Sequence, residues 1–284
     1  MTPIELSKAL DGVVDLDSSL LGKQVLGISA NSKEIGPGFV FIAINGSKFD
    51  GNNFINEALL KGAVCVISDS EHIEKTNEIM KVENARKALG KISANFYRHP
   101  EKKIKLIGVT GTNGKTSTTL ILKNILESHG KKVLQIGTLG VIPNIVNNDF
   151  GLTTPDSIDI FKILNTAVEE EYDFAILEVS SHALSQNRID NLKFDFAGFT
   201  NLTLDHLDYH STIENYFNEK KKLFGLIKDD GSSLILNDSS YGKDICNEYE
   251  NTNTISFKSK DADFYCLDFS LDHNGTTAIF NFKG

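Results

Sequence analysis

The stretch Gly108-Val-Thr-Gly111-Thr-Asn-Gly114-Lys115-Thr116-Ser-Thr-Thr119 decides the fold of this chain. It follows the apolar run Ile104–Val109 and leads into residues whose apolar side chains have helical spacing. A strand, a glycine turn and a Lys-Thr pair that opens a helix are typical of phosphate binding, because backbone N–H groups and the helix dipole attract anions there. We expect Lys115 to reach the terminal phosphates of a nucleotide and Thr116 to ligate magnesium. Val109 departs from the general pattern, which has glycine there, and a glycine turn before a helix can also serve packing alone.

The composition excludes several classes of protein. A chain of 284 residues is long enough for about two domains. The net charge of −9 leaves no basic stripe for a nucleic acid. The longest apolar runs have the length of strands, so no membrane span is expected, and the first residues do not resemble a secretory signal. Cys65, Cys246 and Cys266 are too scattered for a disulfide framework or a zinc cluster, which fits a reducing cytoplasm, and Cys65 is expected to be buried.

Residues 1–99 are predicted to form a small α/β domain. Val40–Ile44 and Ala63–Ile67 are short apolar runs bounded by turn residues, as buried strands are. Phe54–Lys61 between them has helical spacing and is followed by Gly62, a residue type that commonly caps helices. Ala85–Tyr97 is predicted to be a second helix.

Residues 100–284 are predicted to form a second domain around a mostly parallel sheet. The expected strands are Ile104–Val109, Val133–Ile136, Phe174–Val179 and Phe194–Thr200, with helices near 115–129 and 156–170. Strands that alternate with helices pair in parallel through right-handed crossovers. From Gly231 the chain has short strand-like pieces, a small β-rich extension: Ser232–Leu236, Thr254–Phe257, Phe264–Phe269 and Thr276–Phe282. Because the chain stops after such a piece and would leave an open sheet edge, we expect this domain to be incomplete at its C-terminal end.

Polar residues follow the predicted strands at the edge where a parallel sheet binds ligands. Glu178 ends the strand that begins at Phe174 and could hold magnesium, although a glutamate at a strand end is also common on exposed tips. The following residues, Val179-Ser-Ser-His182, add further polar side chains at the same edge.

The segment Asn201–His210 has two histidines and two aspartates within its last six positions. It is either a polar loop with helix-capping aspartates or a second magnesium site in which His206 is a ligand. Neutral imidazole suits softer metals, so His206 would need anionic neighbours. The run Lys220-Lys-Lys222 is either a solvated helix face or a source of positive charge beside a triphosphate.

Five ordered motifs resemble those of the Mur ligase family, and the resemblance covers essentially the whole chain. The family also uses a shorter Gly-x-x-Gly-Lys-Thr loop, which accounts for Val109. The motifs are Gly111–Thr116, Thr153-Thr154-Pro155, Glu178–His182, Gln186-Asn-Arg188 and Asn201–His210.

The resemblance implies an ATP-dependent amide ligase of peptidoglycan synthesis, monomeric and cytoplasmic. Its partners would be UDP-MurNAc-L-Ala-D-Glu and a diamino acid, lysine or meso-diaminopimelate. The dipeptide carboxylate would attack the γ-phosphate to give an acyl phosphate, and the amine would then displace phosphate. Residues 1–99 would bind UDP-MurNAc, and residues 100–284 would form the central ATP-binding domain.

The resemblance also implies roles for individual residues. The expected ATP-binding residues are Gly111, Thr112, Asn113, Gly114, Lys115, Thr116 and Ser117. The expected metal ligands are Thr116, Glu178, His206 and Lys220, the last as a carbamate formed with CO2, although Lys221 is also close by spacing. Catalysis would depend on Lys115, Glu178, His206 and Lys220. A carbamate would give His206 the anionic neighbour that it needs.

The UDP-MurNAc-dipeptide is expected to contact Ser32, Ser47, Thr153, Thr154, Ser180, Gln186 and Arg188. The planar fork of Arg188 suits an anionic substrate. Asn31-Ser32-Lys33 stands where the family usually has Asp-Ser-Arg, so only Ser32 of that triplet is retained.

The resemblance also implies a third, Rossmann-like domain that selects the amino acid, and we expect this domain to be absent from the chain. We therefore expect the chain alone to be inactive. Two alternatives are a nucleotide or UDP-sugar-binding module without ligase activity and a ligase similar to folylpolyglutamate synthase. The retained Lys115, Glu178 and Lys220 argue against the first, and the segment Gly46–Gly51 argues against the second, since the folate enzymes lack such a domain.

Overall fold

The structure, a computed structural model, describes residues 2–46, 49–146, 151–273 and 275–282. The contacts divide the chain into two compact units: Met1–Lys103 with Asp156–Val168 and Gln186–Asn191, and Ile104–Pro155 with Glu169–Ser185 and Leu192–Gly284. This division differs from the predicted boundary after residue 99 by assigning two later segments to the first unit. The boundary between functional domains remains a prediction.

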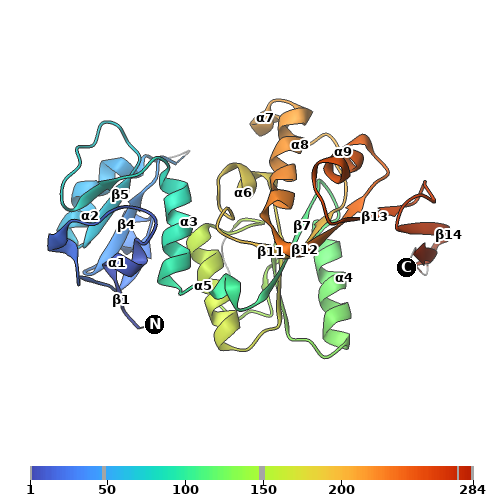
Figure 1. Cartoon of the computed structure of the whole chain (residues 1–284), viewed down its shortest axis with the longest axis horizontal. Helices are drawn as coiled ribbons and strands as arrows, with labels where there is room; N and C mark the ends of the chain where they lie inside the picture. The colour runs from blue at the N-terminus through green and yellow to red at the C-terminus, as the bar shows by residue number, and fades with distance from the viewer. Residues whose placement is uncertain (1, 47–48, 147–150, 274, 283–284) are drawn as a thin grey trace. The chain divides into compact units, whose positions relative to one another are not determined.

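The first unit is built on a parallel sheet with the strand order β3-β4-β5-β6, of which β4 and β5 are labelled in Figure 1. The sheet strands are β3 (Gly27–Ser29), β4 (Phe39–Ala43), β5 (Cys65–Ser68) and β6 (Ile79–Lys81), and β1 (Ile4–Glu5) pairs separately with β2 (Gln24–Val25). The helices are α1 (Leu6–Ala9), α2 (Ile55–Leu60), α3 (Ala85–Phe96) and most of α5 (Ser157–Glu169). Phe41 and Val66 from the strands pack with Ile55 and Ala58 from α2 in one buried cluster, which explains the apolar runs of the sequence.

The second unit contains a nine-stranded sheet with the order β15-β14-β13-β12-β11-β7-β10-β8-β9. All neighbouring pairs from β14 to β8 are parallel, and only the two edge strands, β15 and β9, pair antiparallel. The strands are β7 (Lys105–Thr110), β8 (Val133–Gly137), β9 (Gly140–Ile142), β10 (Phe174–Glu178), β11 (Phe194–Phe199), β12 (Ile227–Leu236), β13 (Thr252–Ser256), β14 (Phe264–Asp272) and β15 (Gly275–Phe282). The helices are α4 (Lys115–Ser128), α6 (Ser181–Ser185), α7 (Leu207–His210), α8 (Ile213–Lys221) and α9 (Ser240–Glu248).

Helix α4 covers the centre of this sheet because its apolar side chains lie one turn apart. Leu122 and Leu126 pack against Ile107, Val133 and Ile176, which come from three neighbouring strands. This packing fixes the N-terminus of α4 at the carboxyl edge of β7.

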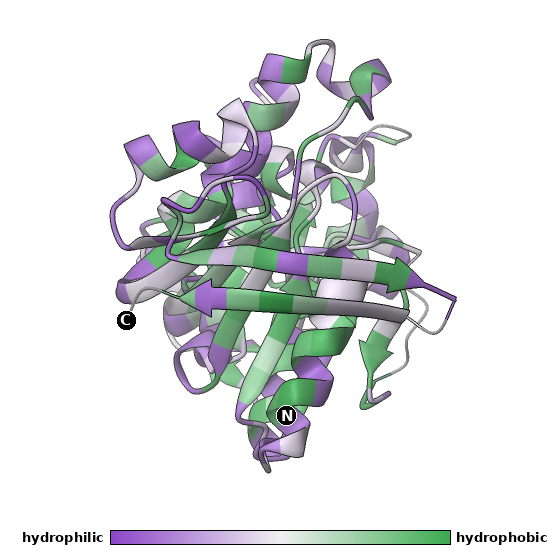
Figure 2. Ribbon diagram, turned by 90° about the vertical axis from the view of Figure 1, so that its right-hand side faces the viewer, coloured by the Kyte–Doolittle hydropathy of each residue, from purple (hydrophilic) through white to green (hydrophobic). Residues whose placement is uncertain are grey.

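The predicted β-rich extension forms one side of the same sheet. β12 and β13 continue the parallel sheet, whereas β14 and β15 form a hairpin at its edge, the two long strands nearest the viewer in Figure 2. Large apolar side chains on the hairpin, including Phe269 and Leu271, are more than half exposed.

The α/β fold with a mostly parallel sheet is confirmed, and the longer predicted elements agree with the observed ones within a few residues. Gly62 follows α2 at a φ of +91°, and Cys65 is buried, as predicted. Very short strands such as β3 and β6 were not predicted. Among the described residues, no helix has the length and apolar character required to cross a membrane.

Candidate functional site

The glycine loop between β7 and α4 has a backbone conformation that two glycines make possible. Gly111 has a φ of +145°, and a Cβ at this position would lie 1.9 Å from Thr200 Oγ1. Gly114 has a φ of +83° at the N-cap of α4. Both positions lie in the left-handed region, where side chains other than hydrogen are strained. The helix therefore begins at Lys115, as predicted.

The segment that follows β11 holds this loop in place. Thr112 N donates to Asn201 O at 2.9 Å, and Asn113 N donates to Asn201 Oδ1 at 3.0 Å. Thr200 Oγ1 donates to Asn113 O at 2.7 Å. The side chains of Asn113 and Ser117 remain exposed, so the loop is accessible to a ligand.

The Lys115 ammonium lies within the loop itself. Its Nζ donates to the carbonyl oxygens of Gly111 and Thr112, each at 2.9 Å. Burial lowers the pKa of Lys115, while Glu178 and Asp205 oppose this effect. These are exchangeable hydrogen bonds, so phosphate oxygens can replace the two carbonyls.

The side chains of Thr116 and Glu178 bring two oxygen atoms together next to the start of α4. Thr116 Oγ1 donates to Glu178 Oε2 at 2.7 Å, and Glu178 is only 1% exposed. Adjacent ligands of an octahedral magnesium ion with bonds of 2.0–2.1 Å are about 2.9 Å apart. The Thr116 hydroxyl and the Glu178 carboxylate therefore fit Mg²⁺ in both chemistry and spacing. In the described ranges, no group of three or more His, Cys, Asp or Glu residues could hold a metal ion by itself.

Sequence reasoning missed the residues that surround the Glu178 carboxylate. Gln135 Nε2 and Thr138 N each donate to Glu178 Oε1 at 3.1 Å, and Thr138 Oγ1 donates to Oε2 at 3.1 Å. A Cβ on Gly137 would lie 2.0 Å from Oε1. The available signals were a glutamine within an apolar strand and a Gly-Thr pair at its carboxyl end.

Lys220 is brought to the same loop from α8. Its side chain is buried, its Nζ donates to Gly111 O at 2.7 Å, and the Nζ lies 4.6 Å from the centre of the Tyr216 ring. The Tyr216 hydroxyl in turn donates to Thr112 Oγ1 at 3.3 Å. Burial, followed by the nearby Lys115, lowers the pKa of Lys220 from 10.5 to about 7, and Asp205 opposes this. The solvated-face alternative is therefore wrong for Lys220, whereas it fits Lys222, whose side chain is 52% exposed and pairs with Glu219.

His206 belongs to a cluster of aromatic and imidazole rings. Its ring lies 5.0 Å from that of His182 and 6.0 Å from that of Tyr216, and its Nε2 is 3.7 Å from Asp205 Oδ2. Burial lowers the pKa of His210, and the nearby His182 lowers it further. The Nε2 atom of His210 forms a 2.9 Å hydrogen bond with Ser181 Oγ. Within the described part of the chain, the ring contacts and the ion pair of His206 do not include Glu178, so a shared metal site remains a prediction.

Three predicted substrate residues lie beside the Glu178 strand. Thr154 Oγ1 donates to Glu178 O at 2.7 Å and accepts from Ser180 N at 3.0 Å. Thr138 Oγ1 lies 3.2 Å from Thr153 Oγ1. The hydroxyl groups of these residues therefore lie close to Glu178.

Three other predicted substrate residues belong to the first unit. Arg188 Nη2 donates to Gln186 Oε1 at 2.7 Å, and Arg188 Nε lies 3.0 Å from Asp156 Oδ1, which fixes the guanidinium. Ser32 begins a short 3₁₀ turn, and its carbonyl accepts from Lys61 Nζ at 2.8 Å. Ser47 lies outside the described residues.

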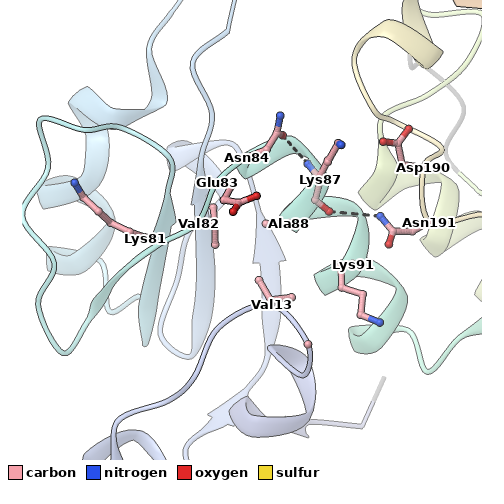
Figure 3. A pocket seen from close by; sticks show the side chains of 11 residues that line it. Val13, Lys81, Val82, Glu83, Asn84, Lys87, Ala88, Lys91, Asp190 and Asn191 are labelled. Atoms are coloured by element: carbon pink, nitrogen blue, oxygen red, sulfur yellow. Dashed lines mark hydrogen bonds between the residues drawn. The ribbon is translucent and has the colours of Figure 1, made fainter.

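The first unit also contains a depression of about 780 Å³ beside the start of α3 (Figure 3). Lys87 and Asn191 line it, and Asn191 Nδ2 donates to Lys87 O at 3.4 Å. Its lining mixes lysines with Glu83 and Asp190 and includes none of the predicted substrate residues. The depression is therefore not part of the candidate site.

Two family profiles match the chain: the Mur ligase middle domain over residues 109–284, and the catalytic domain of the Mur ligase family over residues 24–97. The UDP-N-acetylmuramoyl-L-alanyl-D-glutamate--2,6-diaminopimelate ligase of Clostridium tetani is 39% identical over 283 residues, which cover 97% of this chain and 56% of that protein. The enzyme of the same name from Prochlorococcus marinus subsp. pastoris is 38% identical over 299 residues, which cover 99% of this chain and 58% of that protein. The chain thus spans little more than half the length of these relatives.

Solved structures support the same fold. A UDP-N-acetylmuramoyl-L-alanyl-D-glutamate--2,6-diaminopimelate ligase matches with a TM-score of 0.80 at 24% identity, covering 98% of this chain and 59% of that one. The MurF ligase of Thermotoga maritima, solved with ADP, has a TM-score of 0.57 at 24% identity, covering 89% and 55%. Folylpolyglutamate synthase of Mycobacterium tuberculosis has a TM-score of 0.55 at 12% identity and covers only 68% of this chain and 51% of its own. A family profile over more than half of the residues, together with relatives at 38–39% identity over nearly the whole chain, shows that this chain belongs to the Mur ligase family.

Proposed function

We propose that this chain binds ATP and UDP-MurNAc-L-Ala-D-Glu as part of a ligase that adds 2,6-diaminopimelate to the dipeptide in peptidoglycan synthesis. The pairing of the Thr116 hydroxyl with the Glu178 carboxylate, below a loop that holds the Lys115 ammonium, carries the proposal. A nucleoside triphosphate with its divalent cation needs this combination of hard oxygens, a cation and backbone amides. The two relatives are named as ligases of UDP-N-acetylmuramoyl-L-alanyl-D-glutamate and 2,6-diaminopimelate. These names support UDP-MurNAc-L-Ala-D-Glu as the substrate and favour diaminopimelate over lysine as the added amino acid.

The proposed reaction has two steps. A carboxylate oxygen of the dipeptide attacks the γ-phosphorus of ATP, the bond to the β,γ-bridging oxygen breaks, and ADP leaves. The amine of the amino acid then attacks the acyl carbon of the acyl phosphate, inorganic phosphate leaves, and the new amide loses one proton. Both steps concentrate negative charge, so positioning and cations dominate catalysis.

The residues of the loop have separate roles in this reaction. The backbone amides of the loop and the N-terminus of α4 would hold the phosphates, and Lys115 would exchange its loop carbonyls for phosphate oxygens. Thr116 and Glu178 would hold magnesium, which when bound neutralises charge between the phosphates.

Lys220 would act as a carbamate. An amine with a pKa of about 7 is in large part neutral at physiological pH, so its lone pair can attack CO2. A nitrogen–carbon bond forms, a C=O π pair of CO2 moves onto oxygen and the nitrogen loses one proton, which converts the neutral amine into an anion. The carbamate and His206 would then hold a second magnesium ion.

The predicted contacts of the UDP-MurNAc-dipeptide are the hydroxyls of Thr153, Thr154 and Ser180 in the second unit and, in the first, the residues Ser32, Ser47, Gln186 and Arg188. Arg188 is already oriented by Gln186 and Asp156, which reduces the entropy lost when it binds an anion. The chain would be monomeric and cytoplasmic, and inactive in ligation by itself.

Calorimetric titration of the purified 284-residue chain tests the proposal. MgATP and UDP-MurNAc-L-Ala-D-Glu should each bind to the folded chain. Thr116→Val should weaken MgATP binding at least tenfold, because it removes a hydroxyl ligand while conserving shape, and should leave the UDP-linked dipeptide unaffected. The proposal would be ruled out if the folded wild-type chain bound neither MgATP nor the UDP-linked dipeptide.

A further inference from the structure

The two oxygens of the Glu178 carboxylate have different surroundings. Oε1 accepts from the Thr138 backbone N–H and from Gln135 Nε2, both at 3.1 Å. Oε2 faces two hydroxyls, those of Thr116 at 2.7 Å and Thr138 at 3.1 Å. A hydroxyl can rotate and become an acceptor or a metal ligand, whereas the two N–H groups at Oε1 can only donate. Oε2 is therefore the oxygen that a cation can reach by rearranging hydrogen atoms alone.

Gln135 is an unusual residue for its position in β8. The flanking residues Leu134 and Ile136 are apolar, and Gln135 itself is fully buried. Its amide must present Nε2 to Glu178, because the opposite orientation would place two oxygen lone pairs against each other. The same Nε2 lies 3.4 Å from Thr119 Oγ1, which donates to Thr116 O at 3.0 Å.

The remaining atom of this amide argues against a purely structural role. Within the residues that the structure describes, Gln135 Oε1 is buried and has no hydrogen-bond partner. An unpaired buried acceptor destabilises a fold, and an apolar residue would avoid that cost. The benefit of glutamine at this position must then come from its donor, which faces Glu178.

We propose that Gln135 is a positioning residue for the divalent cation of the nucleotide. By fixing Oε1, it leaves Oε2 beside the Thr116 hydroxyl as a single-oxygen ligand, and through Thr119 it links this carboxylate to the first turn of α4. The inference rests on the proposed function, since it assigns a role toward the cation that Thr116 and Glu178 would hold. Partners of metal ligands in other proteins have such roles, and losing them weakens metal affinity 10-fold to 100-fold.

The test compares nucleotide binding with and without the cation. Gln135→Met removes the donor at similar length, and Leu134→Met is the matched control on the same strand, since it is a volume-conserving change of a buried neighbour. Calorimetry on the 284-residue chain measures the affinity for MgATP and, in EDTA, for ATP alone. We expect Gln135→Met to weaken MgATP binding about tenfold or more, to leave ATP binding in EDTA unchanged, and to melt in EDTA no lower than wild type. Leu134→Met should change neither affinity.

Each result decides the matter. Equal MgATP affinity in wild type and Gln135→Met would overturn the inference, and so would an equal loss of ATP binding in EDTA, which indicates a structural role. If Gln135→Met does not fold, Gln135→Leu replaces it, and failure of both to fold would also show a structural role. If the folded wild-type chain binds no MgATP, the proposed function is wrong, and so is this inference, which depends on it.

Discussion

Replacing Lys220 with methionine should abolish a rise in stability that the wild-type chain shows between pH 7 and pH 10. Lys220 is 1% exposed, and its pKa falls to about 7 in the folded chain from 10.5 in the free side chain. Below pH 7 the amine is protonated in both states, so folding must bury a charge. Between the two pKa values the folded chain has released the proton while the unfolded chain still binds it. Stability therefore rises with pH across this window.

The size of the effect follows from the gap between the two pKa values. One pH unit corresponds to about 1.36 kcal/mol, so a gap of about 3.5 pH units corresponds to a free energy on the order of 5 kcal/mol at full extent. Over the three units from pH 7 to pH 10 the stability of wild type relative to Lys220→Met should rise by roughly 4 kcal/mol. Methionine has no charge to desolvate, so the variant should have its largest advantage near pH 7 or below.

Urea unfolding followed by circular dichroism, in buffers free of CO2 from pH 6 to pH 10, measures this difference. Titrating groups that do not interact with Lys220 act equally in both proteins and cancel in the comparison. Lys222→Met is the matched control, because its side chain is 52% exposed, and its curve should stay parallel to that of wild type. Parallel curves for wild type and Lys220→Met would refute the reasoning that Lys220 is a buried amine neutral near pH 7.

Two further predictions concern the same loop. Gly111→Ala should destabilise the chain by about 1–3 kcal/mol and reduce MgATP affinity at least a hundredfold, because a φ of +145° strains alanine and its Cβ would meet Thr200 Oγ1 at 1.9 Å. Gly198→Ala is its control in urea unfolding and calorimetry, since its nearest atom would be a Val109 methyl at 3.8 Å, and equal behaviour of the two variants would contradict the argument. With ¹³C-labelled bicarbonate, the wild-type chain should show a lysine carbamate resonance in NMR spectra. Lys220→Met should lack that resonance, and its persistence there would assign the carbamate to another lysine.

The parts of the fold that could be predicted from the sequence are those with local signals. Strand β7, the glycine loop and the start of α4 follow each other within a few residues, and each has its own pattern of apolar spacing or glycine. Strands β3 and β6 have three residues each, which is too short for a period of two to be recognised. The nine-residue helix α9 was not predicted either, so the length of an element alone did not determine whether it was found.

The burial of Lys220 could not be predicted, because it depends on packing between distant segments. Its partner, Gly111 O, is 109 residues earlier in the chain, and the neighbouring Lys221 and Lys222 have the same residue type. Gln135 was missed for a similar reason. Its contact with Glu178 requires β8 to lie beside β10, and the sequence does not define the order of strands in a sheet.

The order of the strands explains why the candidate site forms at this place. β7 lies between β11 and β10, so the loop that follows it is restrained from both sides. On one side Asn201, just after β11, accepts hydrogen bonds from the loop backbone; on the other, the parallel register sets Glu178 level with Val109. β8, the next strand beyond β10, adds Gln135 and Thr138 to the same carboxylate. A loop held in this way is ordered before any ligand arrives, so the energy of binding a triphosphate need not be spent on ordering it.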